Sequence, residues 1–464
     1  MVSPKIKFLS NARAAIHPLP LILALAATLS ACAAWQPVSI PTAATDATAA
    51  ASANPLALWW QKFNDPLLSQ LVTQALQANT SIRSAQAALQ QSRALRDVKG
   101  ASLLPGLNAS GSAGRSKSGE FDASNSFKVG LDASWEPDIF GGKRSALNAT
   151  EADAKASEAS LADVQVSVAA EVALAYIQLR GQQAQLAIAR SNLTSQQETL
   201  QITDWRAQAG LVTSLEVEQA RTASEQTSAQ IPTLEASIAK TQHSLAVLTG
   251  QRPDALRVLL TAPQPVPQAA DELAQNIPAQ TLRQRADVRA AEHRITAALA
   301  RVSAADAARY PGFSISGSLG LSALTVGTLS NGASLASSLL AGISLPLFAG
   351  GAAKSQVLAQ EAALEQVRAS YQAVVLTALK DVDDALVALK GDQTRQLHLQ
   401  AAAEAAGHAA LLAQHRYSSG LIDFQTVLLT QRSLLTAQDS VASTSADLSA
   451  DHVRLYKALG GGWN

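Results

Sequence analysis

The chain has 464 residues, and its 36 basic and 36 acidic side chains give a formal net charge of zero. This balance, without any basic run, argues against a nucleic-acid partner. The histidines are scattered over segments of helical composition, and we predict them at the surface. There is no Ser/His/Asp spacing, phosphate-binding glycine loop or metal-ligand cluster in the sequence. We therefore expect a protein that is not an enzyme and that holds no metal or cofactor.

The N-terminal 31 residues are predicted to be a signal peptide. A basic start precedes an apolar run at residues 19–29 that is too short to span a bilayer. The run ends in Leu29-Ser30-Ala31-Cys32, which resembles a bacterial lipobox, and Cys32 is the only cysteine, so disulfide bonds are excluded. We expect N-acyl and diacylglycerol lipid on Cys32, and residues 32–55 as a tether. The alternative is an ordinary signal peptide with a chance cysteine.

An internal repeat divides the rest of the chain. Pro137-Asp-Ile-Phe-Gly-Gly142 recurs as Pro346-Leu-Phe-Ala-Gly-Gly351, and Arg206-Ala-Gln-Ala-Gly-Leu211 recurs as Arg416-Tyr-Ser-Ser-Gly-Leu421, about 210 residues further along. The repeats are expected at 56–250 and 279–464, with a linker at 251–278. Each repeat has a helix, a β-hairpin and a long helical hairpin.

The predicted helices are long and rich in Ala, Gln, Leu and Glu. They cover residues 66–103, 143–208, 212–249, 279–309, 352–417 and 421–459. A helix over residues 143–208 would be about 100 Å long, so it has to pack along its length as in a coiled coil. Close packing is expected along two alanine-rich stretches. They are Ala149, Ala152, Ala156 and Ala159, and residues 401–410.

The hairpins at about 107–137 and 313–346 alternate apolar with small polar residues. Phe127, Val129 and Trp135 share one face, and Lys128 shares the other with serine and glycine. This pattern is typical of a transmembrane β-strand, although a half-buried sheet of a soluble protein has the same period. Four strands cannot close a barrel in lipid, so the barrel has to be shared between chains. The pattern alone leaves eight strands from two chains or twelve from three.

The segment Leu58-Trp-Trp-Gln-Lys-Phe-Asn-Asp-Pro-Leu-Leu68, the two Gly-Gly junctions and the repeated Arg-x-x-x-Gly-Leu motif carry a family resemblance. They resemble the outer-membrane factors, the TolC-like exit ducts, in the OprM/NodT lipoprotein branch. The resemblance implies an α+β membrane protein of the outer membrane. It would be a homotrimer with a twelve-strand β-barrel in outer-membrane lipid and a periplasmic α-barrel of coiled-coil helices. Its partners would be a periplasmic adaptor and an inner-membrane transporter in a tripartite efflux system. A type I protein-secretion duct or a periplasmic adaptor lipoprotein is the alternative.

The resemblance also places a pore constriction where the long helices turn back, at Gly210 and Gly420. Charged and aromatic side chains flank these glycines. They are Arg206, Glu216, Arg416, Tyr417 and Asp423. Three copies of Asp423 would form a ring of negative charge that favours cations, with Glu216 as a carboxylate of the first turn. Arg206, Arg416 and Tyr417 would hold the ring closed through salt links and hydrogen bonds. Alternatively, these charges only solvate a helix turn.

Overall fold

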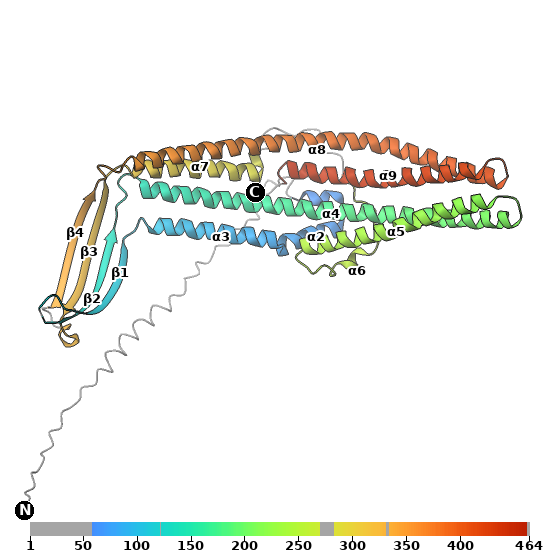
Figure 1. The fold of residues 1–464 in the computed structure, drawn as a ribbon. Helices are drawn as coiled ribbons and strands as arrows, with labels where there is room; N and C mark the ends of the chain where they lie inside the picture. Colours follow the sequence, from blue (N-terminus) through green and yellow to red (C-terminus); the bar gives the residue numbers. More distant parts are fainter. Residues whose placement is uncertain (1–57, 121, 270–282, 331–333, 462–464) are drawn as a thin grey trace, which may run out of the picture. The chain divides into compact units, whose positions relative to one another are not determined.

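The computed structural model describes residues 58–120, 122–269, 283–330 and 334–461 of this chain. They belong to one compact unit. The predicted signal peptide, Cys32 and the tether up to residue 55 lie outside the described residues, as does the segment 270–282, where the linker was predicted to end. The described parts of both repeats follow the predicted order, with a helix, a hairpin of strands and a pair of long helices (Figure 1).

The two hairpins join into one antiparallel sheet. Its strands are β1 (Gly106–Ser116), β2 (Ser124–Trp135), β3 (Gly312–Ala323) and β4 (Leu335–Ser344), paired in the order β1-β2-β3-β4. The register pairs even-numbered residues with even-numbered ones throughout, as in Lys128 with Ser112 and with Ser322. The two faces predicted from sequence are therefore continuous across all four strands. Within the described residues, the outer edges of β1 and β4 have no paired strand.

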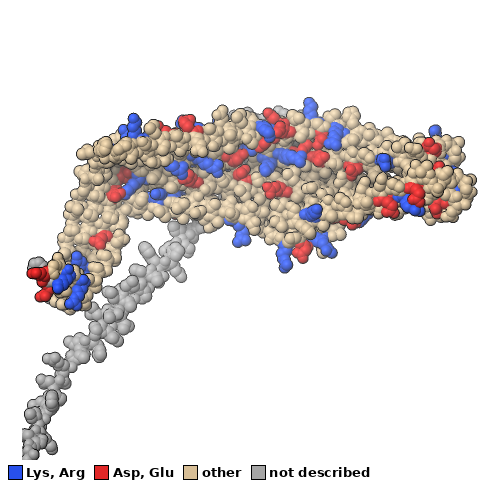
Figure 2. Space-filling model, in the orientation of Figure 1, with Lys and Arg blue, Asp and Glu red and all other residues tan. Residues whose placement is uncertain are grey.

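Four helices make up the long hairpins. They are α4 (Gly142–Gln208), α5 (Ser214–Leu248), α8 (Ala352–Ser418) and α9 (Phe424–Ala458). The helices α4 and α8 have 67 residues each, and at 1.5 Å per residue each is about 100 Å long. Gly141 and Gly351, both in the left-handed conformation, are the N-caps where the chain leaves the sheet. Charged side chains are scattered over the helices and gather at the hairpin end of the sheet (Figure 2).

The alanine-rich stretches have different surroundings. Ala149, Ala152, Ala156 and Ala159 are buried as predicted, because α7 (Ala286–Ala307) packs along α4. Of residues 401–410 in α8, only Ala410 is buried, and the others are exposed or half-buried. The small-residue side of α8 is therefore open in the single chain.

The prediction of one helix over residues 66–103 is wrong. The structure has α2 (Pro66–Ala78) and α3 (Thr80–Ala101), separated by Asn79 in an extended conformation. The Asn79 side chain accepts hydrogen bonds from the amides of Ser81 (2.8 Å) and Ile82 (3.3 Å) and donates one to the carbonyl of Leu248 (2.8 Å). This cap ties the break to the end of α5, a long-range contact that local helix propensity does not contain.

The largest core joins α2, α4, α5 and α9 around the N-terminal 3-10 helix η2 (Trp59–Phe63). Trp59 stacks on Tyr456 of α9 with ring centroids 5.5 Å apart. The middle of α4 has an 18-residue window with mean hydropathy 1.4, long and apolar enough for a membrane span. In the single chain 44% of this window is buried, and its buried residues, such as Tyr176, belong to this core, so we assign the stretch to helix packing. His452 of α9 also lies inside, at 7% exposure, and its predicted surface position is wrong.

Candidate pore-constriction site at the helical turns

The turns that join α4 to α5 and α8 to α9 have the same backbone structure. Gly210 and Gly420 both have φ of 73°, a conformation that costs other residues a steric clash. The next amide bonds back across the turn, from Leu211 to the carbonyl of Arg206 (2.8 Å) and from Leu421 to that of Arg416 (2.9 Å). This is the glycine-dependent helix end known as the Schellman motif. It explains why arginine, glycine and leucine keep their spacing in both repeats.

One predicted residue of the first repeat contacts the second repeat directly. Nη1 of Arg206 donates a hydrogen bond of 3.0 Å to the backbone carbonyl of Tyr417, and its Cζ lies 4.5 Å from the centroid of the Tyr417 ring. That carbonyl is in the last turn of α8, where the helix dipole favours a positive charge. Arg206 therefore joins the end of α8 to the end of α4.

A small apolar cluster surrounds this contact. Tyr417 packs against Phe424 of α9 with ring centroids 5.3 Å apart. Three further buried residues complete the cluster. They are Ala220, Ala413 and Val427. Because they come from α5, α8 and α9, the two helical hairpins share one buried contact close to their turns.

Two polar groups in this region have no hydrogen-bond partner among the described residues. Oε2 of Glu216 is buried and unpaired, and so is the hydroxyl of Tyr417. Thr203 lies nearby, but its hydroxyl donates to the carbonyl of Thr199. Burial raises the pKa of Tyr417. Thr203 and the positive charge of Arg206 oppose that rise, and the negative charge of Glu216 adds slightly to it. Glu216 thus lies near the Arg206–Tyr417 contact without closing a salt link to it.

The other two predicted residues are outside this cluster. Asp423 is the N-cap of α9, and its Oδ1 accepts hydrogen bonds from the amide (2.9 Å) and the hydroxyl (2.5 Å) of Thr426. These bonds lower the pKa of Asp423, which stays fully exposed and ionised. Arg416 is exposed and forms no side-chain hydrogen bond or ion pair with the described residues. The structure therefore brings together Arg206, Tyr417 and Glu216, and leaves Arg416 and Asp423 on the surface of the single chain.

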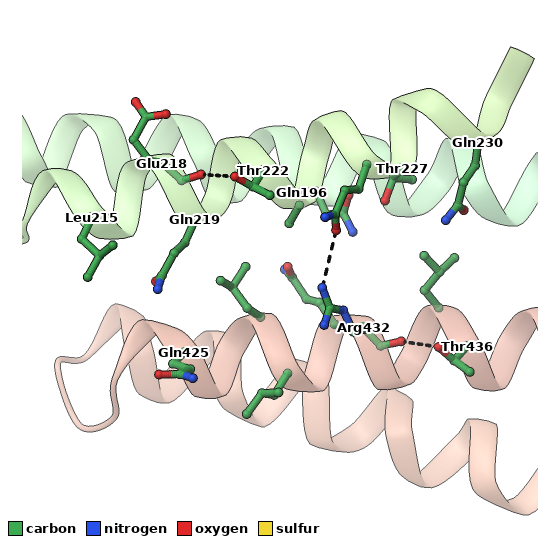
Figure 3. A pocket seen from close by; sticks show the side chains of 16 residues that line it. Gln196, Leu215, Glu218, Gln219, Thr222, Thr227, Gln230, Gln425, Arg432 and Thr436 are labelled. Carbon is green, nitrogen blue, oxygen red and sulfur yellow. Dashed lines mark hydrogen bonds between the residues drawn. The ribbon is translucent and has the colours of Figure 1, made fainter.

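A groove of about 510 Å³, lined by polar side chains and leucines in similar measure, lies between α5 and α9, next to the turns (Figure 3). Gln219, Thr222 and Gln230 line it from α5, and Gln425 lines it from α9. One hydrogen bond crosses it, from Nη2 of Arg432 to Oε1 of Gln226 at 3.5 Å. None of these residues was predicted from the sequence. Their only signal is a run of glutamine and threonine at helical spacing, which also describes an ordinary solvated helix face.

Comparisons with known proteins identify the family to which this chain belongs. A sequence profile of the family described as "Outer membrane efflux protein" matches residues 71–251 and 277–461, most of both repeats. The chain belongs to the outer membrane efflux protein family. Its fold, in which a few strands are joined to long paired helices, is the fold of that family. The predicted resemblance to the OprM/NodT branch is confirmed.

Individual outer membrane efflux proteins match along most of their length. The pyoverdine export outer membrane protein OpmQ of Pseudomonas aeruginosa is 34% identical over 421 residues, which is 87% of each chain. The outer membrane protein OprJ of the same species is 31% identical over 460 residues, 95% of each chain. Among solved structures, the outer-membrane channel OprN has a TM-score of 0.83 at 36% identity, covering 88% of this chain and 93% of its own.

VceC from Vibrio cholerae has a TM-score of 0.82 at 27% identity, covering 88% of this chain and 99% of its own. The predicted function and location are therefore confirmed. This protein is an outer-membrane exit channel of an efflux system.

Proposed function

We propose that three copies of this chain form a homotrimeric duct, and that the sheet carries the strongest evidence for it. One face of the sheet is apolar and the other is rich in serine and glycine, while β1 and β4 end in unpaired edges. In lipid, each unsatisfied backbone group costs several kcal/mol, so these edges have to pair with other copies. Three copies would give a barrel of twelve strands in outer-membrane lipid, continuous with a periplasmic barrel of helices.

The helices support the same assembly. The alanine-rich stretch at residues 401–410 of α8 leaves small side chains exposed in the single chain. Small residues allow helices to approach closely, and a neighbouring copy is the partner that such a face fits. In the trimer the exposed side of α8 would be covered in the way that α7 covers the alanines of α4.

The constriction follows from the turns. In the trimer the three copies of Asp423 would surround the axis, each ionised and held by Thr426, and would favour cations. The Arg206–Tyr417 contact would act as a latch that keeps the two hairpins of one chain together. Arg416 would reach outside its own chain, because nothing described in the chain binds its guanidinium.

The proposed route runs from an inner-membrane transporter through a periplasmic adaptor into this duct, without any chemical change to the solute. Leu211 and Leu421, at 69% and 73% exposure, would give the adaptor an apolar contact at the turns. Relatives are named for the export of pyoverdine, toluene and solvents, which favours small organic solutes over secreted proteins. Lipid on Cys32 would add a second anchor to the barrel.

The test is the mass of the purified protein in mild detergent together with its single-channel conductance in planar bilayers. We expect a trimer whose conductance is small, mostly closed and cation-selective. A monomer without conductance would overturn the proposal. Radioactive palmitate should label the protein, and Cys32→Ser should abolish that label. A label retained by the variant would overturn the assignment of the lipid to Cys32.

A further inference from the structure

The even-numbered face of the sheet is almost uniform in its chemistry. Most of its side chains are serine or glycine, and its partners match across all three strand pairs. In the proposed barrel this face lines the lumen, because the other face carries the large apolar side chains. The inference below rests on that assignment.

Two residues of this face, both in β2, are charged. Lys128 is paired in register with Ser112 and Ser322, whereas Asp132 is paired with Asn108 and Ser318. Both are exposed, and neither forms a salt bridge with the described residues. Asp132 accepts a hydrogen bond of 3.0 Å from the hydroxyl of Ser110. The two charges therefore belong to the lumenal surface and are not neutralised by neighbouring side chains.

The spacing keeps the two charges apart. Four residues along a strand span about 13 Å, which exceeds the Debye length of about 10 Å at 0.1 M salt. Gly130 and Gly320 lie between them, paired so closely that a Cβ on Gly320 would be 3.0 Å from the carbonyl oxygen of Val129. On the β3 side the wall between Lys128 and Asp132 is thus bare backbone, and on the β1 side Ser110, paired with Gly130, contributes only a neutral hydroxyl.

We propose that Lys128 and Asp132 are specificity-determining residues of the β-barrel, separate from the constriction at the turns. The strand β2 runs from the hairpin loop toward the helices, so Lys128 lies nearer the outer opening and Asp132 nearer the periplasm. Three copies of each form two belts of opposite charge. The Lys128 belt attracts anionic solutes at the exit, and the Asp132 belt attracts cationic solutes deeper in the lumen.

The test measures local potential by the modification of single cysteines in the purified full-length protein. Ser322→Cys reports beside Lys128, and Ser318→Cys reports beside Asp132. Each variant is reacted with two methanethiosulfonate reagents. The sulfonatoethyl reagent is negatively charged, and the trimethylammonioethyl reagent is positively charged. The ratio of the two rates cancels any change in thiol reactivity, and the parent protein gives the background from Cys32. At 0.1 M salt, where the Debye length of about 10 Å is shorter than the spacing of the two belts, we expect the negative reagent to be favoured about fivefold at Ser322→Cys.

Removing the charge should remove the preference. Lys128→Gln should bring the ratio of the two rates at Ser322→Cys close to one. At Ser318→Cys the positive reagent should be favoured, and Asp132→Asn should remove that preference. A salt concentration of about 1 M should abolish both preferences. Arg115→Gln is the matched control, because Arg115 lies at the hairpin end of the odd-numbered face. A ratio that Lys128→Gln leaves unchanged, or that Arg115→Gln changes as much, would overturn the charged belts. Cysteines that react only with a lipid-soluble maleimide would instead overturn the lumenal face, and with it the proposed barrel.

Discussion

The Arg206 latch gives the sharpest prediction about gating. Arg206→Met keeps the length and apolar stem of the side chain but removes the guanidinium. The variant loses a charge-assisted hydrogen bond to the Tyr417 carbonyl, about 1.5–3 kcal/mol, and a stack on the ring, about 0.5–1 kcal/mol. Because Arg206 is only half-buried, we take the low end of the sum, a loss of about 2 kcal/mol from the closed state in each copy. This loss shifts the equilibrium toward the open state about thirtyfold.

Open probability in planar bilayers is the measurement for this prediction. Arg190→Met is the matched control, because Arg190 is also in α4 and pairs with Glu235 of α5 at 2.6 Å, but both side chains are about half exposed. Such surface pairs contribute about 0–1 kcal/mol. Tyr417→Phe should also leave gating unchanged, since Arg206 binds the carbonyl and the ring and not the hydroxyl. Equal open probabilities for Arg206→Met and Arg190→Met would refute the latch.

Three further predictions concern the constriction and the packing. Asp423→Asn keeps an acceptor for the N-cap but removes the charge, so cation selectivity should fall at neutral pH with little change in melting temperature. In the parent protein the ionised cap should stabilise α9 above the ordinary aspartate pKa of about 3.9 and lose its effect as the pH falls through the lowered pKa of the folded state. Gly181→Ala should lower the melting temperature, because its Cβ would lie 2.8 Å from that of Ala446. Gly391→Ala, whose Cβ would meet no other part of the single chain within 4 Å, should instead stabilise α8 by up to about 1 kcal/mol. Asn79→Ala should cost about 2 kcal/mol, from the lost cap of α3 and the unpaired carbonyl it leaves, measured by thermal unfolding.

Opposite outcomes would be informative in each case. Unchanged reversal potentials in Asp423→Asn would place this carboxylate away from the ion path. A melting temperature raised by Gly181→Ala would mean that α4 and α9 separate without cost. An unaffected Asn79→Ala would mean that α2 and α3 are positioned by packing alone.

The sequence was most informative where one residue type has one physical use. Gly210 and Gly420 are an example, since few other residues fit a left-handed helix end. The strands could be predicted because the alternation of apolar and polar residues does not depend on how the strands pair. The break at Asn79 could not be predicted, because strong helix formers surround it and its capping partner is distant in sequence. The pairing of Arg206 with Tyr417 could not be predicted either, because both repeats contain an arginine at this position and either one could contact the tyrosine. The position equivalent to Tyr417 in the first repeat is Ala207, which has neither an aromatic ring nor a hydroxyl, and only the fold shows which arginine meets the tyrosine.

The matched lengths of the long helices restrict how such a chain can evolve. The helices α4 and α8 have 67 residues each, and α5 and α9 have 35 each, although their sequences have diverged. An insertion in one repeat alone would move one turn along the axis by about 1.5 Å per residue and rotate its side chains by about 100°. The two turns would then no longer lie at one level. Lineages that lengthen or shorten this protein are therefore expected to gain or lose equal segments in both repeats, in steps close to whole heptads.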